Sequence, residues 1–261
     1  MIIVGEKLNS SIPKTLEALN NRDSAYITDL IKKQADSGAD YIDLNTALTG
    51  EKEIENMLWL IELVQENSTC GIMIDSPNKD IISNCILKVK NRKLIINSIT
   101  LDEGYDNLIE IANQNGAGIV CLPLKDKAIP HTADKRFEFA QKLIEKLRYA
   151  GIEDKNIYID VLLEAVATNE SAVTTSLRTI NLIKENFPEV NTICGLSNVS
   201  FGLPRRANLN ATFLSMALQN GLTSAILDIC CKSVKNSLFA ANALIGKDEY
   251  CMEYINYNRN A

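Results

Sequence analysis

Residues 195–206 read GLSNVSFGLPRR, a polar loop that follows a short apolar run ending in Ile193-Cys194. An amphipathic helix comes next, in which apolar residues recur about one turn apart: Leu209, Phe213 and Met216. The order is strand, loop, helix, with polar residues at the carboxyl end of the strand. Parallel α/β proteins bind ligands at that edge. Asn198 lies there, with an amide that can donate or accept a hydrogen bond.

The same alternation of strand and helix patterns extends along the chain of 261 residues. Eight short apolar runs each precede a segment of helical periodicity: residues 2–4, 41–45, 71–74, 94–96, 118–122, 157–159, the run ending at Cys194, and 225–227. Such uniformly apolar strands are covered on both faces, as parallel strands are. Eight units in about 250 residues predict an α/β fold, a (β/α)8 TIM barrel, as a single domain over residues 1–261. An open doubly wound sheet is the alternative, but it needs a Gly-rich phosphate turn that the sequence lacks.

Charge, hydropathy and cysteine content argue against a nucleic-acid-binding, membrane-spanning or secreted protein. The net charge of −6 gives no electrostatic reason for nucleic acid binding, and no apolar run is long enough to cross a membrane. The amino terminus has no signal peptide pattern. Seven scattered cysteines, including the adjacent Cys230-Cys231, indicate reduced thiols in a cytoplasmic protein. His131 is the one histidine and lies in a polar loop, so no bound metal and no Ser-His-Asp triad are expected.

Acids and amides follow the predicted strands: Glu6, Asn9, Asp43, Asn45, Asp75, Asn97, Asp160, Asn198 and Asp228. In a barrel these ends converge on one mouth. For any one of these residues, a role in capping a helix is about as good an explanation as a role in binding a ligand. Capping does not, however, require the third, fourth and sixth strands each to end in Asp or Asn. Carboxylates accept paired hydrogen bonds from a planar N–H pair, such as that of an amino-pyrimidinone ring or a guanidine. The mouth therefore suits a flat, nitrogen-rich heterocycle better than a phosphorylated sugar.

Six segments, taken in order, carry a resemblance: GEKLN (5–9), IDLN (42–45), IDS (74–76), INS (96–98), YID (158–160) and GLSNVS (195–200). With them, the chain resembles the methyltetrahydrofolate:corrinoid protein methyltransferase family of the pterin-binding barrel superfamily. That superfamily also contains dihydropteroate synthase and the folate module of cobalamin-dependent methionine synthase. One departure concerns the sixth strand, where the family has Asp-Pro-Leu and this chain has Asp160-Val161-Leu162, so the following loop has a freer backbone.

The resemblance implies roles for particular residues. Asp75, Asn97 and Asp160 would hold the pterin ring, and Asn198 would contact N5 as the catalytic residue. Arg206 matches a family arginine near the mouth that meets folate or the corrinoid partner. Other residues expected at the mouth are Glu6, Asp43, Asn45, Ser197 and Phe201. The resemblance leaves the role of Phe201 open.

The resemblance also implies an activity, the transfer of a methyl group between N5 of tetrahydrofolate and the cobalt of a corrinoid. No Asp-x-His-x-x-Gly motif is present, so the corrinoid (cobalamin) is expected on a separate partner protein. The direction of transfer stays open. A dihydropteroate synthase-like pterin transferase and a non-catalytic folate-binding subunit are the alternatives. Trp59 lies in the apolar segment MLWLI, which either packs in the core or faces a second subunit of a homodimer.

Overall fold

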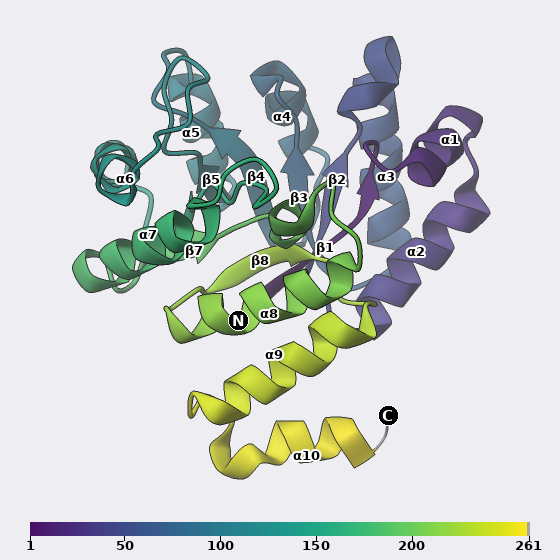
Figure 1. Cartoon of the computed structure of the whole chain (residues 1–261). Coiled ribbons are helices and arrows are strands. Elements are labelled where there is room, and N and C mark those ends of the chain that lie inside the picture. The colour runs from purple at the N-terminus through teal and green to yellow at the C-terminus, as the bar shows by residue number, and fades with distance from the viewer. Residues whose placement is uncertain (260–261) are drawn as a thin grey trace.

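A barrel of parallel strands forms the centre of the computed structural model, which describes residues 1–259 (Figure 1). The strands are β1 (Ile2–Asn9), β2 (Tyr41–Asn45), β3 (Gly71–Asp75), β4 (Leu94–Ile99), β5 (Gly118–Cys121), β6 (Ile157–Asp160), β7 (Asn191–Ile193) and β8 (Ser224–Leu227). Their order is β7-β6-β5-β4-β3-β2-β1-β8, and each neighbouring pair is parallel. Between β7 and β8 a parallel bridge joins Gly195 to Ile226, whose N–H donates to Cys194 O at 2.9 Å. The predicted (β/α)8 TIM barrel is confirmed.

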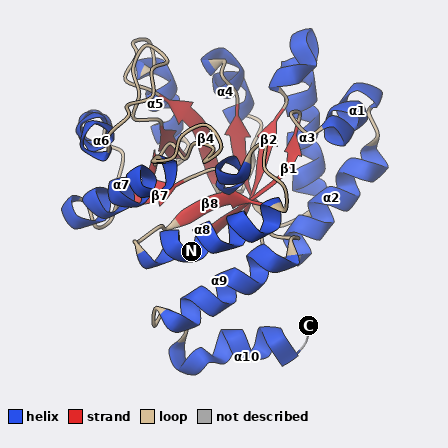
Figure 2. Cartoon of the chain, viewed as in Figure 1, coloured by secondary structure: helices blue, strands red, loops and turns tan. Residues whose placement is uncertain are grey.

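Helices surround the strands (Figure 2). They are α1 (Pro13–Asn21), α2 (Ser24–Asp36), α3 (Glu53–Asn67), α4 (Lys79–Ile86), α5 (Asp106–Gln114), α6 (Ala133–Tyr149), α7 (Ala172–Asn186), α8 (Arg206–Gln219), α9 (Lys232–Leu244) and α10 (Met252–Arg259). Helix α1 was not expected; it is short and begins with a proline, which suits the first turn of a helix. The polar tail from Lys247 onwards predicts a last helix and a frayed end; α10 is that helix, and the frayed end lies outside the described residues, at 260–261.

Of the three residues expected on the buried face of α8, Phe213 is buried, and the expectation is wrong for Leu209 and Met216. The buried residues of the helix are Asn210, Phe213, Leu214, Ala217 and Leu218, while Leu209 and Met216 are 37% and 42% exposed. The stripe is rotated by about one residue because Asn210 faces inward and donates from Nδ2 to Ser197 Oγ at 3.4 Å. A polar residue at a buried helix position misleads an assignment based on apolar spacing.

Two apolar layers hold the barrel together. The larger lies between the strands and the surrounding helices, and Trp59 on α3 packs against it, half-buried, with the Arg22 guanidinium 4.8 Å from the ring centroid. The smaller fills the interior and comprises Val4, Tyr41, Met73, Ile95, Val120, Tyr158 and Ile193, with Ile2 and Ile226 beside them. Within residues 1–259, no helix is both long and apolar enough to span a membrane.

Candidate functional site

A polar layer lies directly above the apolar interior of the barrel. Strand side chains alternate in direction, so the residue two positions after each interior residue points inward again. Counting two positions from Val4, Tyr41, Met73, Ile95, Tyr158 and Ile226 gives Glu6, Asp43, Asp75, Asn97, Asp160 and Asp228. The pleat of the barrel therefore gathers at its carboxyl-terminal mouth six of the nine acids and amides that follow the predicted strands.

Asp75 ends β3, level with Asn45 on one side and Asn97 on the other. Asn45 Nδ2 donates to Asp75 Oδ2 at 2.8 Å, and Asn45 Oδ1 accepts from Ser10 Oγ at 3.1 Å, which fixes the orientation of the amide. Burial raises the pKa of Asp75 to about 6; the Asn45 hydrogen bond opposes this rise and the charge of Glu53 adds to it. At neutral pH Asp75 is thus mostly ionised and held in one orientation, and it becomes protonated as the pH falls toward 6.

Asp160 ends β6, where its Oδ1 accepts the Leu162 N–H at 2.7 Å. Burial raises the pKa of Asp160 to about 6, while the Leu162 N–H and the Arg136 charge lower it and the Asp75 charge raises it. Asp75 and Asp160 therefore share one region of the mouth, close enough for one charge to disfavour the other. A ligand with N–H donors toward both would relieve this repulsion.

Asp43 and Glu6 form the wall of the mouth next to Asp75. Asp43 is fully buried, and its Oδ1 has no hydrogen-bond partner among residues 1–259. Burial, with the charges of Asp75 and Glu6, raises the pKa of Asp43 well above its ordinary value. Burial also raises the pKa of Glu6, although Ser197 Oγ donates to Glu6 Oε1 at 2.8 Å. Asp43 and Glu6 therefore stay protonated to higher pH than ordinary carboxyl groups do.

Asn198 lies on the 3-10 helix η3 (Leu196–Ser200) that follows β7, and it is exposed at the mouth. A Cβ at Gly195 would lie 3.1 Å from Asn198 Nδ2, so the glycine leaves space for the amide. Across the mouth, Asn97 is partly buried, and its Nδ2 lies 3.9 Å from Met73 Sδ. A 3.9 Å contact with a thioether is weak, which leaves the Asn97 amide available to a ligand.

Arg206 contacts the turn that carries Asn198. Its Nη2 donates to Ser197 O at 2.7 Å and its Nε donates to Ser200 Oγ at 3.1 Å. The guanidinium thus clamps η3 on both sides of Asn198, although the side chain remains exposed. Phe201 follows η3 and is 70% exposed, which leaves an aromatic ring uncovered beside Asn198.

Sequence reasoning missed two basic residues near the mouth. Lys7 Nζ pairs with Asp228 Oδ2 at 2.6 Å, which was overlooked because the first strand was expected to end at Val4 rather than Asn9. Arg136 is completely buried on α6, and its Nη2 lies 2.7 Å from Glu164 Oε2. Its sequence surroundings on a charged helix gave no sign of burial.

Metal-ligating side chains are dispersed. Over the described part of the chain, no group of three or more His, Cys, Asp or Glu residues is arranged to hold a metal ion. His131 is exposed in the loop before α6.

Comparisons with known proteins agree with a pterin site. Residues 5–228 match the family model described as pterin binding enzyme. The chain is 31% identical over 97% of its length to methylcorrinoid:tetrahydrofolate methyltransferase of Eubacterium limosum, and the match covers 94% of that protein. It is 30% identical over 87% of its length to methionine synthase of Mycobacterium tuberculosis, and the matched part is 20% of that longer protein.

Solved structures with the same fold include two dihydropteroate synthases. One, from Clostridium difficile in the presence of pteroic acid, superimposes with a TM-score of 0.72 at 15% identity, covering 94% of this chain and 96% of that one. The other, from Xanthomonas albilineans in complex with 7,8-dihydropteroate, gives 0.68 at 14% identity and covers 93% of each chain. At such identities the likeness concerns the fold.

Proposed function

The chain belongs to the pterin-binding enzyme family and to its methyltransferases that act between corrinoids and tetrahydrofolate, and we propose that it methylates N5 of tetrahydrofolate from a corrinoid carried by a separate protein. The name of the Eubacterium limosum relative supports this direction, and the reverse reaction would use the same atoms. We further propose one pterin-binding domain over residues 1–261, a cytoplasmic location and a homodimer.

One observation carries the proposal: Asp75, Asn97 and Asp160 occupy the inward-facing polar layer above the apolar interior. The amino-pyrimidinone edge of a pterin offers N–H groups in one plane, which carboxylates accept as paired hydrogen bonds. Asn97 would meet a ring position that both donates and accepts. Because three separate strands supply these groups, the ring would be held in one orientation.

Asn198 would then face N5. In the proposed direction, the N5 lone pair forms a bond to the methyl carbon, and the cobalt–carbon bond breaks with its electron pair remaining on cobalt. The Asn198 amide oxygen can accept a hydrogen bond from the N5 N–H as positive charge develops on N5, and the proton is then lost to solvent water at the exposed mouth. Such assistance supplies a few kcal/mol, and holding the two partners in line supplies much of the remainder.

Exposed groups beside Asn198 support delivery of the methyl group by a second protein. Phe201 is 70% exposed just after η3, and Arg206 is exposed at the start of α8. Aromatic and arginine side chains are enriched at the centres of protein–protein contacts. We propose that the corrinoid protein docks over this loop.

The test is a transfer assay with the purified protein, tetrahydrofolate and methylcobalamin, in which 5-methyltetrahydrofolate is quantified by chromatography. We expect product in proportion to enzyme. Pteroate formation from a pterin pyrophosphate and p-aminobenzoate without any corrinoid would instead identify a dihydropteroate synthase-like transferase. Tetrahydrofolate binding without methyl transfer, with methylcobalamin and with a methylated corrinoid protein alike, would identify a folate-binding subunit.

A further inference from the structure

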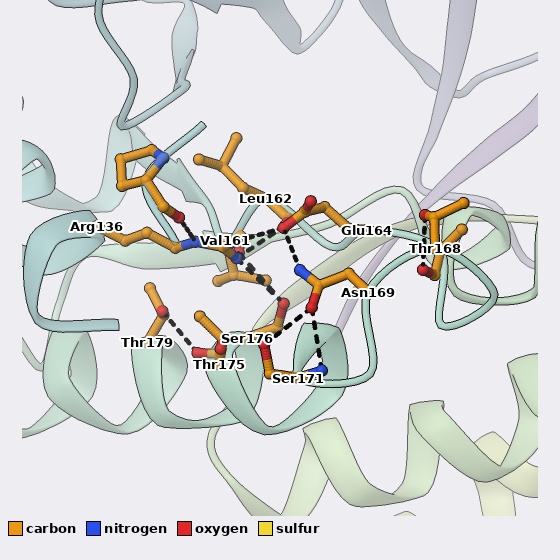
Figure 3. A network of polar contacts seen from close by, with 12 residues as sticks. Arg136, Val161, Leu162, Glu164, Thr168, Asn169, Ser171, Thr175, Ser176 and Thr179 are labelled. Carbon is orange, nitrogen blue, oxygen red and sulfur yellow. Dashed lines mark hydrogen bonds and ion pairs between the residues drawn. The ribbon is translucent and has the colours of Figure 1, made fainter. Parts of the chain in front are cut away.

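Arg136 makes an unusually dense set of contacts for a helix residue. It is 0% exposed, and its guanidinium donates from Nη1 to Val161 O and to Leu162 O, both at 2.8 Å (Figure 3). Its Nε donates to Pro130 O at 2.9 Å. A planar fork of donors can hold several carbonyls at fixed positions, which a lysine ammonium does not do. Arg136 therefore fixes the backbone that leaves β6.

Glu164 completes the cluster from the other side. Its Oε2 accepts from Arg136 Nη2 at 2.7 Å and from Asn169 Nδ2 at 3.1 Å. Asn169 Oδ1 in turn accepts from the N–H of Ser171 at 3.0 Å and from its hydroxyl at 2.8 Å, at the start of α7 (Figure 3). Both ends of the β6–α7 loop, residues 161–171, are thus tied to one ion pair, whose arginine is buried and whose glutamate is partly exposed.

The held segment contacts two groups of the proposed pterin site. Leu162, in the loop after β6, has φ 52°, a left-handed conformation that a leucine does not adopt unless its surroundings fix it, and its N–H donates to Asp160 Oδ1 at 2.7 Å. Further along, the Val166 N–H donates to Val199 O at 3.1 Å, next to Asn198 on η3. The loop therefore links Asp160 to the turn that carries Asn198.

We propose that the Arg136–Glu164 ion pair is a positioning device that holds the Asp160 carboxylate, through the β6–α7 loop, in the orientation that binds the pterin ring. The role rests on the function proposed above. The expectation of a freer backbone after Asp160 is therefore wrong, because side-chain contacts constrain the loop where the family has proline. Neither residue touches the substrate site directly, so both are positioning residues.

A purely structural role is the alternative. Burying an ion pair is often neutral or unfavourable for stability compared with apolar packing, so stability alone is a weak reason for Arg136 to be buried. Arg148 provides an internal comparison on the same helix. It makes a bidentate pair with Asp154 at 2.8 and 2.6 Å and lies 5.1 Å from the Phe187 ring centroid, and among residues 1–259 no hydrogen bond or ion pair joins it to residues 161–171.

The experiment compares Arg136→Lys with Arg148→Lys, since both variants keep the charge and lose the fork. Two quantities are measured on the full chain: the affinity for tetrahydrofolate by calorimetry, and the titration of the Asp160 carboxyl by ¹³C NMR without folate. Asp160→Asn assigns the resonance. We expect Arg136→Lys to weaken binding about tenfold or more and to move the Asp160 titration to higher pH, because the Leu162 N–H bond is lost. Arg148→Lys should leave both within about twofold of wild type.

Wild-type values for both measurements in a folded Arg136→Lys protein would overturn the proposal. If that variant does not fold, Glu164→Gln is measured in its place, since its partly exposed side chain tolerates the change better; unchanged affinity and titration there would overturn it equally. Failure of the wild-type protein to bind tetrahydrofolate would count against the proposed function, whereas the ¹³C titration still decides whether Arg136 positions Asp160.

Discussion

Asn198 Nδ2 lies 3.1 Å from the point that a Cβ on Gly195 would occupy, which makes residue 195 the neighbour that decides where the amide of Asn198 rests. Gly195 has φ −75°, so its backbone conformation is open to any residue, and the glycine is needed there for space alone. A contact at that distance forces a displacement of a few tenths of an ångström. The proposed reaction depends on the position of this amide, so small changes at residue 195 have measurable consequences.

Gly195→Ala should lower the methyl-transfer rate about fivefold to tenfold at saturating folate, because the added methyl displaces Asn198 from N5. The folate KM should change little, since Asp75, Asn97 and Asp160 remain in place. Steady-state kinetics checks this. In the double variant Gly195→Ala/Asn198→Ala the two losses should not add, because both act on one amide. Full additivity would mean that Gly195 acts through something other than Asn198.

Asp160→Asn should stabilise the protein near neutral pH. The pKa of Asp160 is raised to about 6, so the folded state binds a proton more tightly than the unfolded state. The stability from that proton is complete below pH 4 and is lost as pH rises through 6, up to a bound of about 3 kcal/mol. Thermal melting should show a higher Tm for Asp160→Asn at pH 7 and no difference at pH 4.

Asp102→Asn is the matched control for that measurement. Asp102 accepts the Asp126 N–H at 2.9 Å and a hydrogen bond from Thr100, and these bonds lower its pKa. The sign is opposite: the carboxylate contributes stability above pH 4 that is lost as pH falls. This variant should therefore melt slightly below wild type at pH 7. A lower Tm for Asp160→Asn as well would contradict the raised pKa of Asp160.

Asn45→Ala should shift the pH dependence of folate binding. Asn45 donates to Asp75 and thereby lowers the pKa of that carboxyl, which burial raises to about 6. Without the donor the pKa of Asp75 rises further, and the carboxylate needed for binding forms at higher pH. Affinity measured from pH 5 to 8 should show the midpoint displaced upward by about half a unit or more, with convergence toward wild type at pH 8.

Asn84→Ala is the control for Asn45→Ala. Asn84 is an exposed amide on α4 whose Nδ2 donates to Asp80 O at 2.7 Å, and among the described residues its side chain makes no hydrogen bond outside its own helix. The binding profile of this variant should superimpose on that of wild type. Identical profiles for Asn45→Ala and Asn84→Ala would show that the Asn45 bond does not tune Asp75.

The polar layer of the barrel follows from the chain's own periodicity. Short apolar runs ending in Asp marked Asp75 and Asp160 correctly as strand ends, whereas β4 continues past Asn97 to Ile99; all three lie near the carboxyl ends of parallel strands, which must meet. Contacts between distant segments gave no such local signal. Arg136 and Glu164 are 28 residues apart, and nothing in the pattern of α6 marks its arginine as buried.

The predicted buried face of α8 was wrong at Leu209 and Met216 for a related reason. Apolar spacing favours Leu209 and Met216 as core residues, but Asn210 takes an inward position, where its Nδ2 donates to Ser197 Oγ at 3.4 Å and its Oδ1 has no hydrogen-bond partner among the described residues. A partner supplied from thirteen residues upstream is a tertiary effect, and tertiary packing overrides local pattern.

The most direct measurement is methyl transfer and tetrahydrofolate binding by Asn198→Ala beside Asn208→Ala, which removes an exposed amide in the first turn of α8. If Asn198 meets N5, its removal lowers the transfer rate about tenfold or more while tetrahydrofolate affinity falls less than about threefold, and Asn208→Ala matches wild type in both. A transfer rate in Asn198→Ala equal to that of Asn208→Ala would contradict the placement of the methyl-bearing nitrogen at Asn198.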